Sequence, residues 1–272
     1  MSELLDWFQT PPGQTARAWE QQCFDAALAD VFGYHALQIG LPNFDVLAAN
    51  RMPQRWLAAI PAPAASPNAR MVARESSTAR PVALMTASEA LPFDEESLDL
   101  VALPHALELS TDPRATLREV HRVLVHEGRV AITGFNPLSL WAWRQQRARW
   151  YRYLGGGRLY LPETGEFIGM MRLRDWLLLL GFEIERTSFG CYQPAVRGAR
   201  SLARFGWMER VGRRSWPMFG ATYFVLAVKR APGARLIGRT WKKVPGIVAA
   251  PASVTRRHAH LSRNLEHESE AR

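Results

Sequence analysis

Residues 88–137, SEALPFDEESLDLVALPHALELSTDPRATLREVHRVLVHEGRVAITGFNP, decide the fold that we expect for this chain. Residues 97–103 (SLDLVAL) form a short and mostly apolar run, as in a strand that is covered on both faces. Asp112 and Pro113 then predict the start of a helix, because Asp caps free amides and Pro leaves no N–H unpaired in the first turn. Residues 129–134 (RVAITG) predict a second strand. Strand, helix and strand form a parallel βαβ crossover, so we expect an α/β protein with a doubly wound sheet.

The composition is that of a globular, basic protein. The chain has 272 residues, of which 47% are apolar, enough for one full domain with additions. Its two cysteines, Cys23 and Cys191, lack the spacing of metal ligands, so we expect buried free thiols and no metal site. We expect neither a signal peptide nor a membrane span, because no apolar run has the required length. These features predict a cytoplasmic protein, and the formal net charge of +9 requires an explanation.

Several motifs together resemble a known enzyme family. Residues 90–93 (ALPF) and 97–101 (SLDLV) resemble the Leu-Pro-Phe … Ser-Phe-Asp-Val pattern of class I S-adenosylmethionine-dependent methyltransferases, in the branch that often contains ubiquinone- or menaquinone-type methyltransferases. Residues 117–124, followed by Gly128, resemble that family's helix before the fifth strand. The resemblance covers roughly residues 17–229. It implies a Rossmann-like methyltransferase fold, with a mostly parallel seven-stranded sheet and helices on both faces, and S-adenosyl-L-methionine as cofactor.

The glycine-rich motif of the family is degenerate in this chain. Residues 36–39 predict the first strand, and Gly40 opens the turn where the resemblance places the cofactor. The family has an acidic residue and three spaced glycines there, whereas this chain keeps Gly40 and continues with Leu41 and Pro42. Two interpretations remain open. The pocket is either reshaped and functional, with Gly40 and Leu41 at the cofactor, or the fold has lost its cofactor.

The remaining elements are predicted from local patterns. Residues 1–13 are expected to be irregular and residues 14–32 to form a helix that ends at Gly33. A helical segment is expected near residues 54–60, a second strand at 70–73 and a third at 82–85.

Three residues after these strands are candidate cofactor contacts. The resemblance implies a carboxylate for the ribose at the end of the second strand, where Glu75 fits, although an exposed surface Glu is equally consistent with the sequence. After the third strand the family often has an Asp for the adenine amino group. This chain has Ala87 and Ser88 instead, so adenine would be held by backbone and apolar packing, with one hydrogen bond from Ser88.

The candidate catalytic residue follows the fourth strand, which ends at Pro104 and His105. Ligands of open α/β sheets collect at the carboxyl ends of the strands, so we expect Pro104 at the cofactor and His105 near the reacting methyl group. A His can act as a general base, because its pKa lies near neutrality. The alternative is a hydrogen-bonded residue in the wall of the site.

Basic residues concentrate in three regions. Two insertions, near residues 141–160 and 195–216, interleave Arg with aromatic residues, and residues 232–272 form a basic tail that we expect to be disordered. Residues 1–231 would then form the methyltransferase-like domain. The insertions could contact nucleic acid or ring-shaped ligands, or they could be amphipathic helices with a solvated basic face.

The sequence therefore predicts S-adenosylmethionine-dependent methyl transfer to an unidentified acceptor, with a small molecule as the first candidate. Two other classes stay open: an RNA- or DNA-associated methyltransferase, which would use the positive charge, and a catalytically silent methyltransferase-like binding protein.

Overall fold

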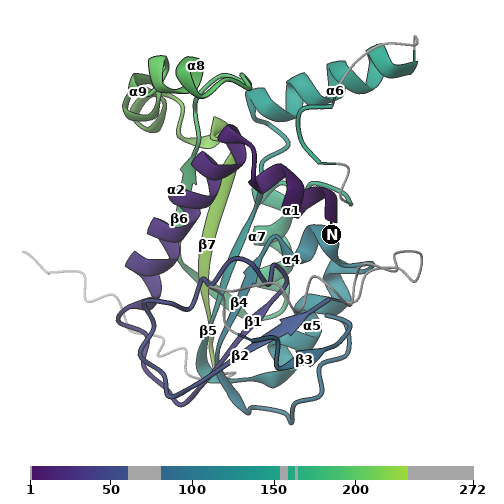
Figure 1. The fold of residues 1–272 in the computed structure, drawn as a ribbon. Coiled ribbons are helices and arrows are strands. Elements are labelled where there is room, and N and C mark those ends of the chain that lie inside the picture. Colours follow the sequence, from purple (N-terminus) through teal and green to yellow (C-terminus); the bar gives the residue numbers. More distant parts are fainter. Residues whose placement is uncertain (1, 61–80, 154–158, 163–164, 232–272) are drawn as a thin grey trace, which may run out of the picture. The chain divides into compact units, whose positions relative to one another are not determined.

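The computed structural model describes residues 2–60, 81–153, 159–162 and 165–231, all of which belong to one compact unit within Met1–Ala234 (Figure 1). The predicted tail at residues 232–272 and the predicted strand at 70–73 lie outside the described residues. Within the described ranges, no helix combines the length and the apolar character needed to cross a bilayer.

Seven strands of the described residues form one sheet in the order β3-β2-β1-β4-β5-β7-β6. Their bounds are β1 His35–Ile39, β2 Gln54–Ala59, β3 Leu84–Met85, β4 Leu98–Pro104, β5 Leu124–Phe135, β6 Phe182–Gly190 and β7 Thr222–Lys229. Strands β1 to β5 are parallel, and β7 pairs antiparallel with both β5 and β6. This arrangement confirms the predicted mostly parallel seven-stranded sheet.

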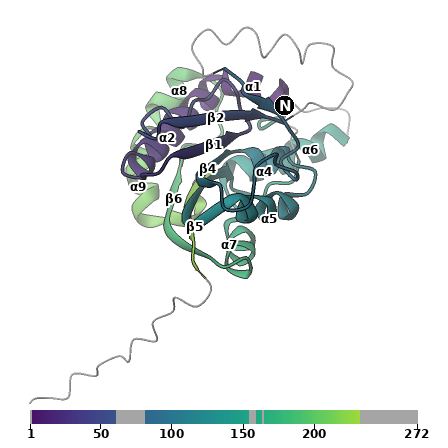
Figure 2. The ribbon, with the colours of Figure 1, turned by 90° about the horizontal axis from the view of Figure 1, so that it is seen from below.

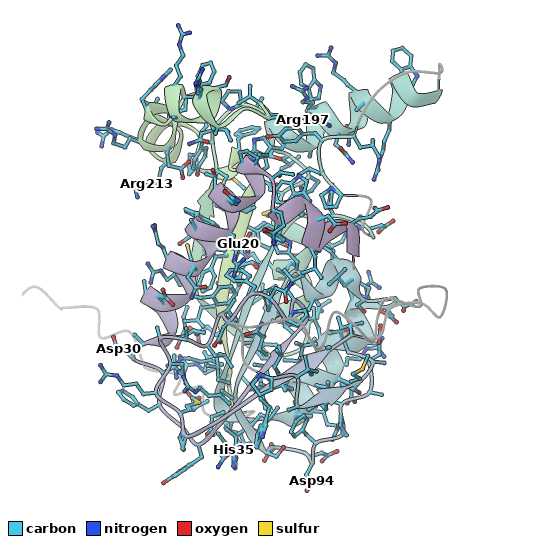
Figure 3. The ribbon with its side chains drawn as sticks, in the orientation of Figure 1. Glu20, Asp30, His35, Asp94, Arg197 and Arg213 are labelled. Carbon is cyan, nitrogen blue, oxygen red and sulfur yellow. The ribbon has the colours of Figure 1, made fainter. Side chains whose placement is uncertain are left out.

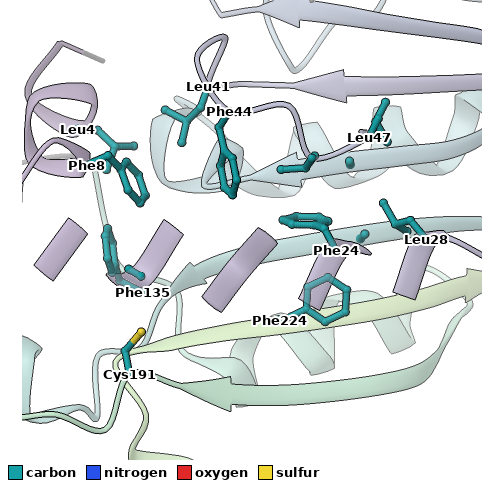
Figure 4. Packing of buried hydrophobic residues seen from close by; sticks show 14 of the residues in the cluster. Leu4, Phe8, Phe24, Leu28, Leu41, Phe44, Leu47, Phe135, Cys191 and Phe224 are labelled. Carbon is teal, nitrogen blue, oxygen red and sulfur yellow. The ribbon is translucent and has the colours of Figure 1, made fainter. Parts of the chain in front are cut away.

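Helices cover both faces of the sheet, as Figure 2 shows for α2 on one side and α5 and α7 on the other. Their bounds are α1 Ser2–Phe8, α2 Pro11–Leu28, α4 Ala106–Leu109, α5 Pro113–Val123, α6 Leu140–Tyr153, α7 Met170–Leu179, α8 Ala199–Arg204 and α9 Trp207–Ser215, with a 3-10 turn η1 at Pro217–Phe219. Each face has its own apolar core. On one face, Phe24 of α2 packs on Phe224 of β7 (Figure 4). On the other face, Leu117 and Val120 of α5 belong to the second core.

The helix that begins at Pro113 is confirmed, together with its cap. The Asp112 carboxylate accepts hydrogen bonds from the backbone N–H groups of Arg114 at 2.9 Å and Ala115 at 3.0 Å. These two bonds satisfy amides that the first turn leaves free, which fixes where α5 starts after β4.

The prediction for the amino terminus is wrong. Residues 2–8 form α1, and the segment expected to be irregular supplies the first turn of α2, with Pro11 and Pro12 at its start. Proline is favoured at the first helical positions because its missing N–H has no partner there in any case. The Thr10 side chain caps the helix by accepting from the Gly13 N–H at 3.4 Å.

The prediction for residues 54–60 is also wrong, because Gln54–Ala59 is the strand β2 rather than a helix. It pairs in parallel with β1, from His35 opposite Gln54 to Ile39 opposite Ala58. Its Gln, Arg, Leu and Ala residues favour helix locally, but pairing with a distant strand overrides that preference. The second strand therefore ends at Ala59, which removes the reason for placing Glu75 at the ribose. Glu75 itself lies outside the described residues.

Candidate active site

The turn at Gly40 lies against the end of β4. Gly40 has φ of +119°, and its N–H donates to the carbonyl of Ala58 at 3.0 Å. A Cβ atom at this position would lie 3.0 Å from the carbonyl oxygen of Pro104. Both the backbone angle and the close approach require glycine. The turn predicted from the sequence is thus present, and it brings Gly40 beside Pro104 at the carboxyl edge of the sheet.

A buried side chain that the sequence analysis missed shapes the loop after Gly40. Gln38 of β1 is 1% exposed, and its amide nitrogen donates to the carbonyl oxygens of Leu41, at 3.0 Å, and Phe44. Its carbonyl oxygen accepts from the N–H of Val46 at 3.1 Å. These three bonds hold the loop where the family uses further glycines. The available signal was a polar residue within an otherwise apolar strand.

Helix α1 covers the loop after Gly40. Leu41, which we predicted as a cofactor contact, is 1% exposed and belongs to the same buried cluster as Phe44 and the α1 residues Leu4 and Phe8. Figure 4 shows Leu4 and Phe8 facing Leu41 and Phe44. The rings of Phe8 and Phe44 have centroids 6.4 Å apart. The Leu41 side chain therefore packs toward α1, so in this state any contact with a cofactor would come from its backbone.

His105 is the centre of a buried ionic cluster at the end of β4. Its Nδ1 lies 2.7 Å from Glu108 Oε2 of α4, and its Nε2 lies 2.9 Å from Glu20 Oε1 of α2. All three side chains are at least 98% buried. The second carboxylate oxygens are also used: Thr133 donates to Glu20 at 3.3 Å and the Phe135 N–H donates to Glu108. The backbone of His105 is left-handed, with φ of +52°.

The cluster keeps His105 protonated. Burial alone lowers the pKa of an imidazole, but the adjacent carboxylates of Glu20 and Glu108 outweigh that effect and raise the pKa of His105 to about 10. A protonated His105 donates one N–H to each carboxylate. It then has no lone pair with which to accept a proton, so the geometry of this state fits the hydrogen-bonded wall residue better than a general base. The role of His105 as a base stays a prediction.

The two predicted adenine contacts, which are adjacent in the chain, have different environments in the structure. Ala87 is exposed after β3, whereas Ser88 is fully buried and its hydroxyl lies 2.9 Å from the hydroxyl of Thr116 on α5. The Thr116 hydroxyl also lies 2.8 Å from the hydroxyl of Ser110. Ser88 therefore fixes α5 against the β3–β4 connection, and its hydroxyl is engaged within the protein.

A cavity of about 350 Å³ lies at the carboxyl end of β5. It is lined by Asn136, Pro137, Leu138, Phe167, Gly169, Met170, Met171, Arg172, Phe189 and Met218. Two aromatic contacts connect its lining to the ionic cluster: the Phe167 and Phe135 ring centroids are 5.5 Å apart, and those of Phe135 and His105 are 4.5 Å apart. The cavity, the cluster and the Gly40 turn thus share one edge of the sheet.

Comparison with known proteins identifies a family model and a relative that match this chain. Residues 45–132 match the family model of the methyltransferase domain. The uncharacterised protein YafS of Escherichia coli (strain K12) is 29% identical over 182 residues, which are 67% of this chain and 66% of YafS, so the match spans slightly less than two thirds of that relative.

Solved structures share the fold. An S-adenosylmethionine-dependent methyltransferase from Thermotoga maritima has a TM-score of 0.58 at 16% identity, over 84% of this chain and 95% of its own. The [4+2]-cyclase SpnF has a TM-score of 0.52 at 18% identity, over 81% and 83%. Residues 45–132 thus match a methyltransferase domain, for which S-adenosylmethionine is the implied cofactor, and the described sheet has the fold of these solved structures.

Proposed function

We propose that this protein transfers a methyl group from S-adenosylmethionine to a small, largely apolar molecule bound in the cavity at the end of β5. The observation that carries the proposal is the position of that cavity. It lies at the same sheet edge as the Gly40 turn, and its lining is predominantly apolar. Small-molecule sites are typically apolar clefts of this size with a few polar groups. Here Asn136 and Arg172 are the polar groups.

The residues around Gly40 fit the methionine end of the cofactor. Gly40 presents bare backbone beside Pro104, a space that a Cβ would partly fill. The nearby cluster contains two carboxylates, Glu20 and Glu108, for one imidazolium, and the excess negative charge favours a cationic ligand. S-adenosylmethionine supplies an electrophilic methyl group carried by a sulfonium. The adenine end has less support, because Ala87 offers no carboxylate.

The chain would contribute orientation and exclusion of water. Phe8 and Phe135 flank the His105 ring, with centroids 5.3 Å and 4.5 Å away. Holding two reactants in line converts a bimolecular step into one that is effectively unimolecular, which lowers the barrier to methyl transfer. His105 would position Glu20 and Glu108 through its two N–H groups.

The test compares two glycines that each precede a helix. Gly169 lines the cavity and caps α7 with φ of −66°, and Gly198 caps α8 with φ of −83° outside that cavity. Both have negative φ and room for a Cβ, since the nearest atoms lie 3.4 Å and 3.5 Å away. We expect Gly169→Leu to abolish transfer of labelled methyl groups into organic-extractable molecules, with unchanged cofactor affinity. Gly198→Leu should behave as the wild type.

The proposal is refuted if the label enters RNA or DNA rather than the organic extract, or if Gly169→Leu methylates the extract normally. A catalytically silent binding protein is the second candidate, because Leu4 and Phe8 pack in front of the Gly40 loop. Absence of cofactor binding would favour it.

A further inference from the structure

Helix α9 presents its apolar side to solvent. The side that faces the protein carries Glu209, whose carboxylate accepts from the N–H of Tyr192 at 3.0 Å, and Gly212, where a Cβ would collide with the Tyr192 ring. On the opposite side, Trp207 is 54% exposed and Val211 is 41% exposed. Surface helices normally turn their apolar stripe toward the core. The outward apolar side of α9 therefore suits contact with a partner outside this compact unit.

The outward side of α9 continues into a larger apolar surface. We define the apolar patch as Leu140, Trp207, Val211, Trp216, Met218 and Phe219, which are between 41% and 57% exposed. All except Met218 line a second cavity of about 480 Å³, together with Tyr192, Met208 and Gly212. Contiguous exposed surfaces of this kind mark sites of interaction with another protein, a membrane or a ligand.

Arginines border the apolar patch. Arg210 and Arg214 follow Trp207 and Val211 by three residues each, so they occupy the neighbouring stripe of α9. Both are exposed, as is Arg213. Helices α6, α8 and α9 gather at one end of the compact unit in Figure 1, and Figure 3 shows Arg197 and Arg213 at that end.

We propose that the apolar patch docks onto an anionic lipid bilayer, with the arginines of α9 against the headgroups. Trp and Phe favour the interfacial region of a bilayer, and arginine stems lie along apolar surface while their guanidinium groups reach anionic headgroups. A helix that combines an apolar face with a basic flank lies in the plane of the interface. Docking of this kind needs no membrane-spanning segment.

The side chains favour lipid over nucleic acid. Single-stranded nucleic acid is bound by aromatic rings that stack on bases, within a polar and basic groove. Leu140, Val211 and Met218 have no ring to stack, yet they are exposed within the same surface as the tryptophans. Insertion into the headgroup region would remove both the aliphatic and the aromatic side chains of the apolar patch from water. This transfer is favourable in free energy for any apolar side chain.

The apolar patch adjoins the cavity at the end of β5. Leu138 and Met218 line that cavity, and their sequence neighbours Leu140 and Phe219 line the cavity on the patch. An apolar acceptor dissolved in the bilayer would therefore enter the cavity from the docked face. This route rests on the proposed function, whereas the docking itself does not.

The experiment is co-sedimentation of the full chain with phosphatidylcholine vesicles that contain or lack phosphatidylglycerol, without cofactor. We expect binding to the anionic vesicles that weakens with salt.

Arg210→Gln with Arg214→Gln should weaken this vesicle binding about 30-fold, since each arginine near an anionic surface contributes roughly fivefold to the affinity. Trp216→Ala with Phe219→Ala should weaken it about tenfold or more. Two double variants serve as matched controls, because they change exposed side chains outside the apolar patch. They are Arg118→Gln with Arg174→Gln, and Phe32→Ala with Tyr34→Ala, and both should bind the vesicles as the wild type does.

Three results would overturn the docking. The first is no binding to anionic vesicles at low salt, and the second is equal binding by the α9 variants and the wild type. The third is evidence that the apolar patch serves another partner. In that case the same variants would impair RNA binding, or convert a dimer to a monomer, while vesicle binding is unchanged. Because vesicle binding is measured without cofactor, a failed methyl-transfer assay leaves this result intact.

Discussion

Replacing His105 by Asn should flatten the dependence of unfolding free energy on pH above neutrality. Burial lowers the pKa of His105, but Glu20 and Glu108 raise it further, from the ordinary value of 6.5 to about 10. The unfolded chain loses this proton near pH 6.5, and the folded protein keeps it until about pH 10. The stability that the raised pKa contributes is therefore fully present below pH 6.5 and is lost as the pH rises to about 10.

The expected slope follows from one proton. Between pH 7 and pH 9 the folded protein holds about one proton more than the unfolded chain, which corresponds to about 1.4 kcal/mol per pH unit, or about 3 kcal/mol over the interval. Asn is the suitable replacement because it tolerates the left-handed backbone of His105, with φ of +52°.

The assay is urea unfolding followed by tryptophan fluorescence at pH 7, 8 and 9. The control is His121→Asn. Burial lowers the pKa of His121, so this group titrates below the interval and its variant should keep the wild-type slope. If the free energies of the wild type and His105→Asn run parallel from pH 7 to pH 9, His105 is not a protonated partner of both carboxylates, and this account of the cluster is wrong.

Two further predictions concern the edges of the site. Gln38→Met removes the three hydrogen bonds to the loop after Gly40 and leaves buried backbone groups unpaired. The unfolding free energy should therefore fall by about 3 kcal/mol, and the amides of residues 41 and 43–46 should exchange faster in hydrogen–deuterium exchange. Unchanged exchange would contradict the role of Gln38. Ala87→Asp restores the carboxylate of the family and should tighten cofactor binding roughly ten- to a hundredfold by calorimetry; unchanged affinity would mean that adenine lies elsewhere.

The elements that the sequence predicted correctly have local signals. The Asp112 cap, the apolar run of β4 and the turn at Gly40 each depend on a few neighbouring residues, and each is present in the structure. The strand β2 depends instead on pairing with β1, and its residues favour helix when read alone. Strand β2 could therefore not be recognised from its own residues.

The candidate site depends on contacts between distant residues. Glu20 lies in α2, 85 residues before His105 at the end of β4, so no spacing pattern links the two. The sequence identified a basic insertion near residues 195–216, but not that Glu209 and Gly212 would face the protein and leave Trp207 of α9 facing outward. Gln38 did carry a signal, because a buried strand rarely contains an amide side chain without a specific hydrogen-bonding role.

Calorimetric titration with S-adenosylmethionine tests the central claim, that this chain binds its cofactor at the Gly40 turn. We expect the wild type to bind with a dissociation constant of roughly tens to hundreds of micromolar, because one charge-assisted contact to adenine is missing. Gly40→Ala and Gly181→Ala form a matched pair, since both glycines have positive φ but a Cβ meets a neighbour within 4 Å only at Gly40. Binding should weaken about tenfold or more in Gly40→Ala and stay unchanged in Gly181→Ala. No heat from the wild type at millimolar cofactor, or equal losses in the two variants, would contradict the claim.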